Sequence, residues 1–295
     1  MAVCLVFGGG GQVGRELARA RPPDGWRVEA LDRAVADITD KAAVQAALDR
    51  VRPAVIVNAA AYTAVDKAES EPERAYAINA VGAGHVADAA AKHEIPLVHL
   101  STDFVFHDAK GGALAEAAPV DPHGAYAASK LAGEVEVRRR GGKHVILRTA
   151  WVFGAFGGNF VKTMLRLAQE RSELRVVGDQ RGAPTPAADI AGTCLAIAHR
   201  LAGPNHGPAH LGTFHFCGMP ATTWHGFAEA ILDQAAARGH PRPPVHQIET
   251  KDYPTPARRP VDSTLDCGKL ARLYGVAQPD WRPGLASVLK ELLGD

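Results

Sequence analysis

Short, mostly apolar runs of residues recur through the first half of the chain. Each run has the length of a single strand and too few residues for a typical helix. Runs of this kind are typical of parallel strands that are buried on both faces. They predict strands at Val3–Phe7, Val28–Leu31, Val55–Val57, Leu97–Leu100 and Val145–Leu147.

Longer stretches with helical character lie between these runs. Asp40 and Pro72 are residues of the kinds that open helices. The predicted helices are Gln12–Arg21, Lys41–Val51, Glu73–Lys92 and Ala125–Arg139. Because strand and helix alternate, the pattern predicts an α/β fold, namely a Rossmann-type doubly wound parallel sheet.

The alternation weakens after about Trp151. In the second half we expect helices at Phe160–Gln169, Ala187–Leu201 and Trp224–Ala237, a strand within His210–Cys217, and a loop rich in proline and histidine from Gly239 to Pro260. We therefore expect residues 1–152 to form an NAD(P)-binding Rossmann domain, to which some later elements return. Residues 153–295 should form mainly a smaller C-terminal substrate-binding lobe.

Composition narrows the possible partners. The 295 residues carry a net charge of +1, with 33 basic and 32 acidic side chains, which gives no indication of nucleic-acid or membrane binding. The four cysteines form no CxxC pair and no cluster with zinc spacing, so we expect no metal site from them. No apolar run approaches the ~18 residues of a membrane span. A cytoplasmic, soluble protein is the expectation.

A glycine-rich turn follows the first predicted strand and opens the first predicted helix. Gly8, Gly11 and Gly14 keep a GxxGxxG spacing. A dinucleotide site needs such glycines for a tight turn, for close approach of a pyrophosphate to the backbone, and for close helix–sheet packing. The N–H groups and the dipole at the start of the helix favour phosphate. The turn therefore predicts a dinucleotide-binding site.

Charged residues after the second predicted strand point to the adenosine end of that site. Asp32 lies eighteen residues after Gly14, where a carboxylate can accept hydrogen bonds from the ribose. Arg33 can neutralise a 2′-phosphate, so NADPH is expected and NADH stays possible. Asp37 and Ile38 can flank the adenine.

Two further strand ends carry candidate residues. Small side chains in Asn58-Ala59-Ala60-Ala61 would let a flat cofactor lie against the backbone. The next predicted strand ends in Ser101-Thr102-Asp103. Because ligands bind outside the carboxyl ends of parallel strands, Thr102 is placed to reach a substrate oxygen.

Tyr126 and Lys130 are the strongest catalytic candidates. They lie four residues apart, which on a helix places the phenol and the ammonium on one face, one turn apart. A phenol has a pKa near ~10. We expect the neighbouring cation to lower the pKa of Tyr126 toward neutral pH. With the glycine-rich turn, the pair predicts a nicotinamide enzyme that reduces a carbonyl group.

Longer segments in both halves show a narrower resemblance. They are 57–69 (VNAAAYTAVDKAE), 101–106 (STDFVF), 148–152 (RTAWV), 159–168 (NFVKTMLRLA), 179–185 (DQRGAPT) and 253–260 (YPTPARRP). Together with the glycine turn and the Tyr/Lys pair, these segments resemble the dTDP-4-dehydrorhamnose reductases of the extended short-chain dehydrogenase/reductase superfamily. The likeness runs from about Val3 to Trp281.

The resemblance implies NAD(P)H-dependent reduction of dTDP-4-dehydro-L-rhamnose to dTDP-L-rhamnose, with Tyr126 as proton donor, Lys130 on the nicotinamide ribose and Thr102 beside the reacting oxygen. It implies a cofactor site with these further residues: Gly11, Gln12 and Val13 at the phosphates; Asp32, Asp37 and Ile38 at the adenosine; Ala61, Tyr62, Thr63 and Leu100 further along. Asp103 and Trp151 would touch the sugar nucleotide. Arg258 and Arg259 are candidates for clamping its diphosphate.

Some members of this family hold Mg²⁺ between two subunits through glutamates. Glu16 is retained here, whereas Ala188 stands at about the position of another acid. A Mg²⁺-bridged homodimer therefore stays open.

Two other functions also stay open. A non-catalytic NADP-binding regulatory subunit, resembling the methionine adenosyltransferase β subunit, would share this fold. A reductase or epimerase of another nucleotide sugar would also use the Tyr/Lys pair.

Overall fold

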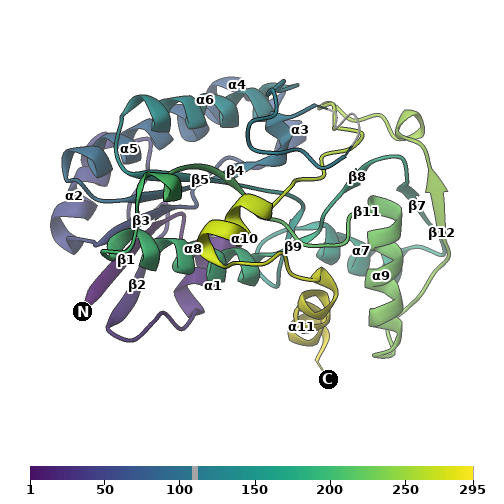
Figure 1. The fold of residues 1–295 in the computed structure, drawn as a ribbon. Coiled ribbons are helices and arrows are strands. Elements are labelled where there is room, and N and C mark those ends of the chain that lie inside the picture. The colour runs from purple at the N-terminus through teal and green to yellow at the C-terminus, as the bar shows by residue number, and fades with distance from the viewer. Residues whose placement is uncertain (108–111, 295) are drawn as a thin grey trace.

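A six-stranded sheet lies at the centre of the computed structural model, which describes residues 1–107 and 112–294 (Figure 1). All its strand pairs are parallel. From one edge to the other the strands are β10 (Gly212–His215), β5 (His144–Thr149), β4 (Leu97–Thr102), β3 (Val55–Asn58), β1 (Ala2–Phe7) and β2 (Trp26–Leu31). The order reverses between β1 and β3, which is where doubly wound sheets bind nucleotides. The expected fold class is confirmed.

Helices cover both faces of this sheet (Figure 1). One face carries α1 (Gln12–Arg19), α8 (Ala187–Ala202) and α10 (Gly268–Tyr274); the other carries α2 (Lys41–Val51), α5 (Ala83–Lys92) and α6 (Ala125–Arg139). Successive side chains of a strand point to opposite faces. Accordingly Cys4 and Val6 of β1 join the first core and Leu5 and Phe7 the second, and all four are fully buried.

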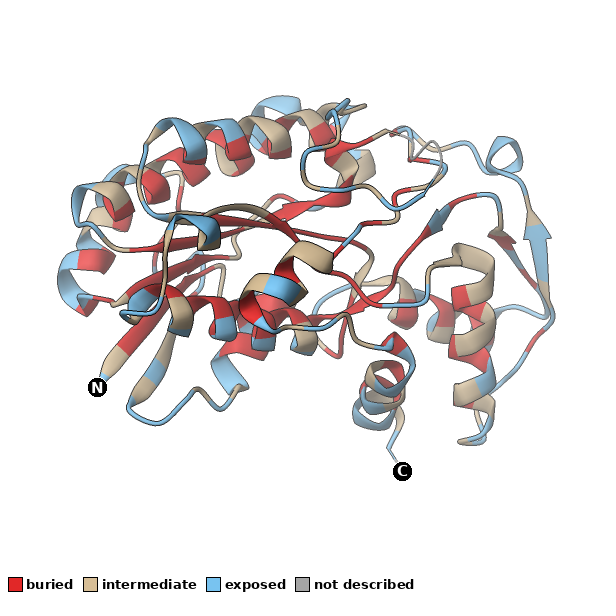
Figure 2. Ribbon diagram, viewed as in Figure 1, coloured by how far each residue is buried: buried red, intermediate tan, exposed pale blue. Residues whose placement is uncertain are grey.

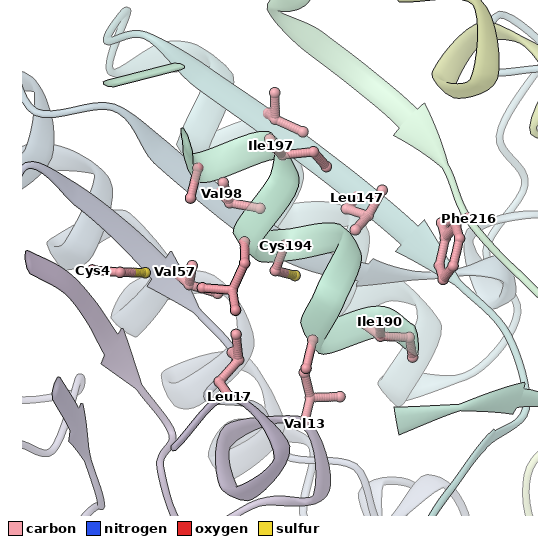
Figure 3. Close-up of a cluster of buried hydrophobic side chains, with 14 of the residues drawn as sticks. Cys4, Val13, Leu17, Val57, Val98, Leu147, Ile190, Cys194, Ile197 and Phe216 are labelled. Carbon is pink, nitrogen blue, oxygen red and sulfur yellow. The ribbon is translucent and has the colours of Figure 1, made fainter. Parts of the chain in front are cut away.

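The first of these cores shows how the second half of the chain returns to the sheet. Ile190, Cys194 and Ile197 of α8 lie against Val57 and Leu147 of the central strands (Figure 3). Strand β10 also extends the sheet beside β5. Burial is concentrated along the strands and on the inner sides of the helices (Figure 2).

The predicted helix Glu73–Lys92 forms as three consecutive pieces. They are α4 (Pro72–Tyr76), the π-helical turn η1 (Ala77–Gly82) and α5. Pro72 occupies the first turn as expected. The π turn was not predicted, because its wider spacing has no separate signature in the hydrophobic pattern. It buries Asn79, whose amide donates to Tyr62 O and to Ser129 Oγ at 3.0 Å each.

A third core lies beyond the sheet. The helices α7 (Phe160–Glu170), α9 (Trp224–Ala236) and α11 (Trp281–Leu293) surround the buried rings of Phe153, Phe227 and Trp281. The expected loop from Gly239 to Pro260 is partly wrong. It contains β12 (Val245–Ile248), which pairs in parallel with β7 (Leu174–Val177), and the short turn η4 (Thr250–Asp252).

The remaining elements are short. They are α3 (Val65–Ala68), η2 (Asp103–Val105), β6 (Val152–Phe153), β8 (Arg181–Gly182), β9 (Thr185–Pro186), η3 (Pro208–His210) and β11 (Thr222–Thr223). Strand β6 pairs with β9, and β8 pairs with β11. Within residues 1–107 and 112–294, no helix has both the length and the apolar character needed to cross a bilayer.

A buried ion pair fastens α6 to the sheet. Arg148 of β5 donates to both carboxylate oxygens of Glu134, through Nε at 2.8 Å and Nη2 at 2.7 Å. Ser101 of β4 and Arg138 also donate to Glu134, at 2.6 and 2.7 Å. Burial opposes ionisation of Glu134, but the bonds and charge of Arg148 outweigh it and hold the pKa of Glu134 at about 2. The carboxylate is therefore charged at neutral pH.

Replacement of Arg148 should destabilise the fold strongly. Arg148→Leu leaves the carboxylate of Glu134 buried without its bidentate partner, so we expect the free energy of unfolding in urea to fall by about 3–5 kcal/mol. The matched control is Arg166→Leu, which breaks the exposed Arg166–Glu170 pair of α7. That loss should be below about 1 kcal/mol. Equal losses in the two variants would contradict the structural role assigned to the buried pair.

Candidate active site

The glycine turn between β1 and α1 is packed against the segment that follows β3. Gly8 has φ +86°, and a Cβ there would lie 2.5 Å from Ala60 N. A Cβ at Gly14 would lie 2.1 Å from Gly8 O. Neither position has room for any side chain. No side chain caps the start of α1 at Gly11, so the first N–H groups of the helix remain available for an anion.

A cleft of about 380 Å³ opens beside this turn. It is lined by Gly8, Gly10, Gly11, Arg33, Ala36, Asp37, Ile38, Ala59, Ala60, Ala61, Tyr62, Thr63, Ala64, Arg74 and Ile78. Seven predicted cofactor residues therefore meet in one cleft: Gly8, Gly11, Asp37, Ile38, Ala61, Tyr62 and Thr63. The cleft combines a glycine cradle, a free helix start and small walls, which together fit a dinucleotide.

Other predicted cofactor residues lie outside the lining of this cleft. Val13 and Gly14 are buried in α1, where Gly14 provides the close packing described above. Gln12 accepts a hydrogen bond from Asn159 Nδ2 at 3.0 Å. Asp32 follows β2 and accepts from Val35 N at 3.1 Å, so its carboxylate also stabilises a turn. Contact of these residues with a cofactor stays a prediction.

Two arginines and one aspartate set the charge of the cleft. Arg33 Nε donates to Asp37 Oδ2 at 2.8 Å. The backbone N–H of Thr39, and then the Thr39 hydroxyl and Arg33, keep the pKa of Asp37 below its usual range. Arg74 approaches from α4 and lies over the Tyr62 ring, 5.6 Å from its centre. Sequence reasoning missed Arg74, because nothing in the local sequence indicates that α4 faces this cleft.

Lys130 is buried beneath the predicted catalytic face of α6. Its Nζ donates to Leu100 O of β4 at 2.8 Å, and the residue is 3% exposed. Burial lowers the pKa of Lys130 to about 8, against the opposing charge of Glu134. The ammonium therefore keeps its proton over most of the neutral range and is fixed against the end of β4.

Tyr126 lies one turn earlier on α6, with its ring edge-on to Phe104 at 5.6 Å between centres. The expectation of a lowered pKa for this phenol is wrong in the protein without ligand. Burial raises the pKa of Tyr126 to about 12, and the nearby charge of Asp103 adds to this effect. Only a hydrogen bond with the Thr102 side chain acts in the other direction. The ammonium of Lys130 is bound to Leu100 O and does not offset the effect of burial on this phenol.

Thr102 and Asp103 lie where β4 passes into η2. Thr102 Oγ1 accepts from Phe104 N at 3.2 Å and donates to Asp103 Oδ1 at 3.1 Å. Asp103 Oδ2 accepts from Ser263 Oγ at 2.6 Å. Burial raises the pKa of Asp103 to about 6, although Ser263 and Thr102 oppose the rise. The carboxylate of Asp103 thus points to Thr102 and Ser263, and its predicted contact with the sugar nucleotide stays a prediction.

Trp151 has an unusual backbone. Its φ is +44°, which non-glycine residues rarely adopt. Its ring stacks on that of Trp224, with centres 3.5 Å apart and planes 5° apart. A Cβ at Gly182 would lie 2.4 Å from the same ring. Trp224 therefore covers one face of Trp151, and contact with a sugar stays a prediction for the remainder of the ring.

The two predicted arginine clamps differ in their surroundings. Arg259 forms a two-point ion pair with Asp66 of α3, through Nη2–Oδ2 at 2.7 Å and Nη1–Oδ1 at 3.1 Å. Arg258 is exposed. Because Asp66 already engages the guanidinium of Arg259, that arginine ties the segment after η4 to α3. Binding of a diphosphate by Arg258 and Arg259 stays a prediction.

Glu16, the residue linked to a possible Mg²⁺ site between subunits, is buried and engaged in an ion pair within this chain. Both carboxylate oxygens of Glu16 accept from Arg19, at 2.6 and 2.8 Å, and Arg19 also donates to Glu291 at 2.8 Å. In the described part of the chain no three His, Cys, Asp or Glu side chains gather closely enough to hold a metal ion. A homodimer stays a prediction.

Comparison with known proteins extends these observations. A family model described as the RmlD substrate binding domain matches residues 1–293. A dTDP-4-dehydrorhamnose reductase of Aggregatibacter actinomycetemcomitans is 43% identical over 291 residues, which is 98% of each chain. This chain belongs to the dTDP-4-dehydrorhamnose reductase family. The reductase of Escherichia coli (strain K12) is 41% identical over 294 residues, which is 98% of this chain and 97% of the other.

A solved structure of this reductase family shows the same fold. The dTDP-4-dehydrorhamnose reductase of Bacillus anthracis, determined in complex with NADP, has a TM-score of 0.89 and 35% identity. The match covers 99% of this chain and 100% of that one. Membership in the family confirms the resemblance inferred from the sequence motifs.

Proposed function

We propose that this protein reduces the 4-keto group of dTDP-4-dehydro-L-rhamnose with NADPH to give dTDP-L-rhamnose, the last step of dTDP-rhamnose biosynthesis. The observation that carries the proposal is the meeting of Tyr126, Lys130 and Thr102 at the carboxyl end of β4. Similarity to reductases along almost the whole chain supports the choice of substrate.

Bound NADPH supplies the hydride for this reaction. The role of Tyr126 is to give its proton to the alkoxide that develops at the sugar C4. A pKa of about 12 keeps this phenol protonated at neutral pH, as a proton donor requires. Lys130 is the cation that stabilises the phenolate left behind. Thr102, whose hydroxyl donates to Asp103 and accepts from Phe104 N, would lie beside the same sugar oxygen and help to position it against Tyr126.

The alternatives are less well supported. A regulatory subunit that only binds NADP has no need of Thr102, Tyr126 and Lys130 in one place. Reduction or epimerisation of another nucleotide sugar would use the same three residues. However, relatives that match this chain over nearly its whole length are named dTDP-4-dehydrorhamnose reductases. A cytoplasmic location accords with four cysteines that all remain free thiols.

The first test follows the absorbance of reduced nicotinamide with purified protein and dTDP-4-dehydro-L-rhamnose. We expect rapid oxidation by the wild type and a kcat lower by ~10²–10⁴ in Tyr126→Phe, which removes only the hydroxyl. Tyr76→Phe is the control, since Tyr76 is 40% exposed on α4. Wild-type turnover in Tyr126→Phe would refute the proton-donor role. Absence of turnover in the wild type would refute the proposed reaction.

We also propose that NADPH is preferred over NADH, because Arg33 lines the cleft directly after β2, where its guanidinium can bind a 2′-phosphate on the ribose. Arg33→Ser should raise KM for NADPH about tenfold or more and leave KM for NADH nearly unchanged. The control is Arg27→Ser, which alters an exposed arginine of β2 paired with Glu29. An equal change for both cofactors would contradict the assignment.

A further inference from the structure

A segment remote in sequence reaches the centre of the candidate active site. Residues 261–266 run between two other parts of the chain: Ser263 N donates to Arg181 O at 3.1 Å, and Leu114 N donates to Thr264 O at 2.8 Å. This places Ser263 beside Asp103, although 160 residues separate them. Ser263 is 3% exposed, so water does not compete for its hydroxyl.

The contacts of Ser263 form a chain that ends at the phenol. Ser263 Oγ donates to one oxygen of Asp103, and Thr102 Oγ1 donates to the other. The Thr102 side chain in turn acts on Tyr126, since it lowers the pKa of that phenol against the effect of burial. Since Phe104 N also donates to Thr102 Oγ1, the position of this oxygen is set by Asp103 and by the turn of η2.

We propose that Ser263 is a positioning residue for the reduction, which acts through Asp103 to hold the Thr102 hydroxyl beside Tyr126. The inference rests on the proposed function and adds to it a residue from the C-terminal half of the chain. The Ser263 hydroxyl donates to Asp103, so its contribution passes through that carboxylate.

The hold on the Thr102 hydroxyl depends on the negative charge of Asp103. A donor aimed at a carboxylate stabilises the ionised form, and Ser263 and Thr102 both lower the pKa of Asp103 against its burial. With a pKa of about 6, Asp103 is ionised at pH 7 and loses its charge as the pH falls through 6. A protonated Asp103 accepts less strongly from Thr102, so turnover should decline in acid.

Ionisable groups on the neighbouring elements have partners of their own. On α6, Lys130 is bound to Leu100 O, while Tyr126 faces Asp103 and stays neutral at this pH. On β5, Arg148 is paired with Glu134, and His215 of β10 contacts Leu114 O. In the segment itself, the carboxylate of Asp262 accepts from Thr264 and that of Asp266 accepts from Gly268 N.

The test is the dependence of kcat on pH, with NADPH and dTDP-4-dehydro-L-rhamnose as substrates. Ser263→Ala removes one donor from Asp103, so the acid limb of kcat should move from about pH 6 to higher pH. At pH 7 we expect kcat to fall about tenfold, with KM for NADPH little changed. Ser263→Thr, which keeps the hydroxyl, should restore the wild-type limb.

Two further variants separate positioning from a general loss of structure. Thr193→Val removes a buried hydroxyl of α8, on the opposite face of the sheet, and should leave the limb in place. Asp103→Asn removes the titrating group, so the limb near pH 6 should disappear. If the acid limb of the kcat profile does not move in Ser263→Ala, or persists in Asp103→Asn, the inference is wrong but the proposed function is unaffected. A wild type without turnover would overturn the proposed function, and the inference with it.

Discussion

The buried ion pair between Glu134 and Arg148 is the interaction on which the rest of the site depends. Tyr126, Lys130 and Glu134 follow one another at intervals of four residues, so they form one stripe along α6. Glu134 fastens that stripe to β5 through Arg148 and to β4 through Ser101, the neighbour of Thr102. The same strand end that carries Thr102 therefore fixes the helix that carries the phenol and the ammonium.

Burial gives these groups their protonation states. It raises the pKa of Tyr126 to about 12, lowers that of Lys130 to about 8 and raises that of Asp103 to about 6. At pH 7 the phenol is therefore neutral, the ammonium charged and the carboxylate charged. A protein that only bound a nucleotide would gain nothing from a protonated phenol on the same face of α6 as a buried ammonium. A carbonyl reductase requires a proton donor of this kind.

Much of this could be predicted from local sequence. The central strands, the glycine turn and the Tyr126–Lys130 pair are encoded in short segments, through hydrophobic runs, glycine spacing and the helical period. Contacts between distant segments could not be predicted in this way. Ser263 meets Asp103 only because residues 261–266 return to the sheet, and Arg74 reaches the cleft only through the placement of α4. The direction of the pKa shift of Tyr126 was mispredicted because local sequence shows the neighbouring cation but not the degree of burial.

The most direct test of the account is to follow a labelled hydrogen into the sugar. The protein would be incubated with dTDP-4-dehydro-L-rhamnose and NADPH carrying deuterium at both C4 positions of the nicotinamide, and the sugar product analysed by mass spectrometry and NMR. The account predicts dTDP-L-rhamnose with one deuterium, at C4 of the hexose. Recovery of the keto sugar unchanged, or of a sugar product without deuterium at C4, would contradict it.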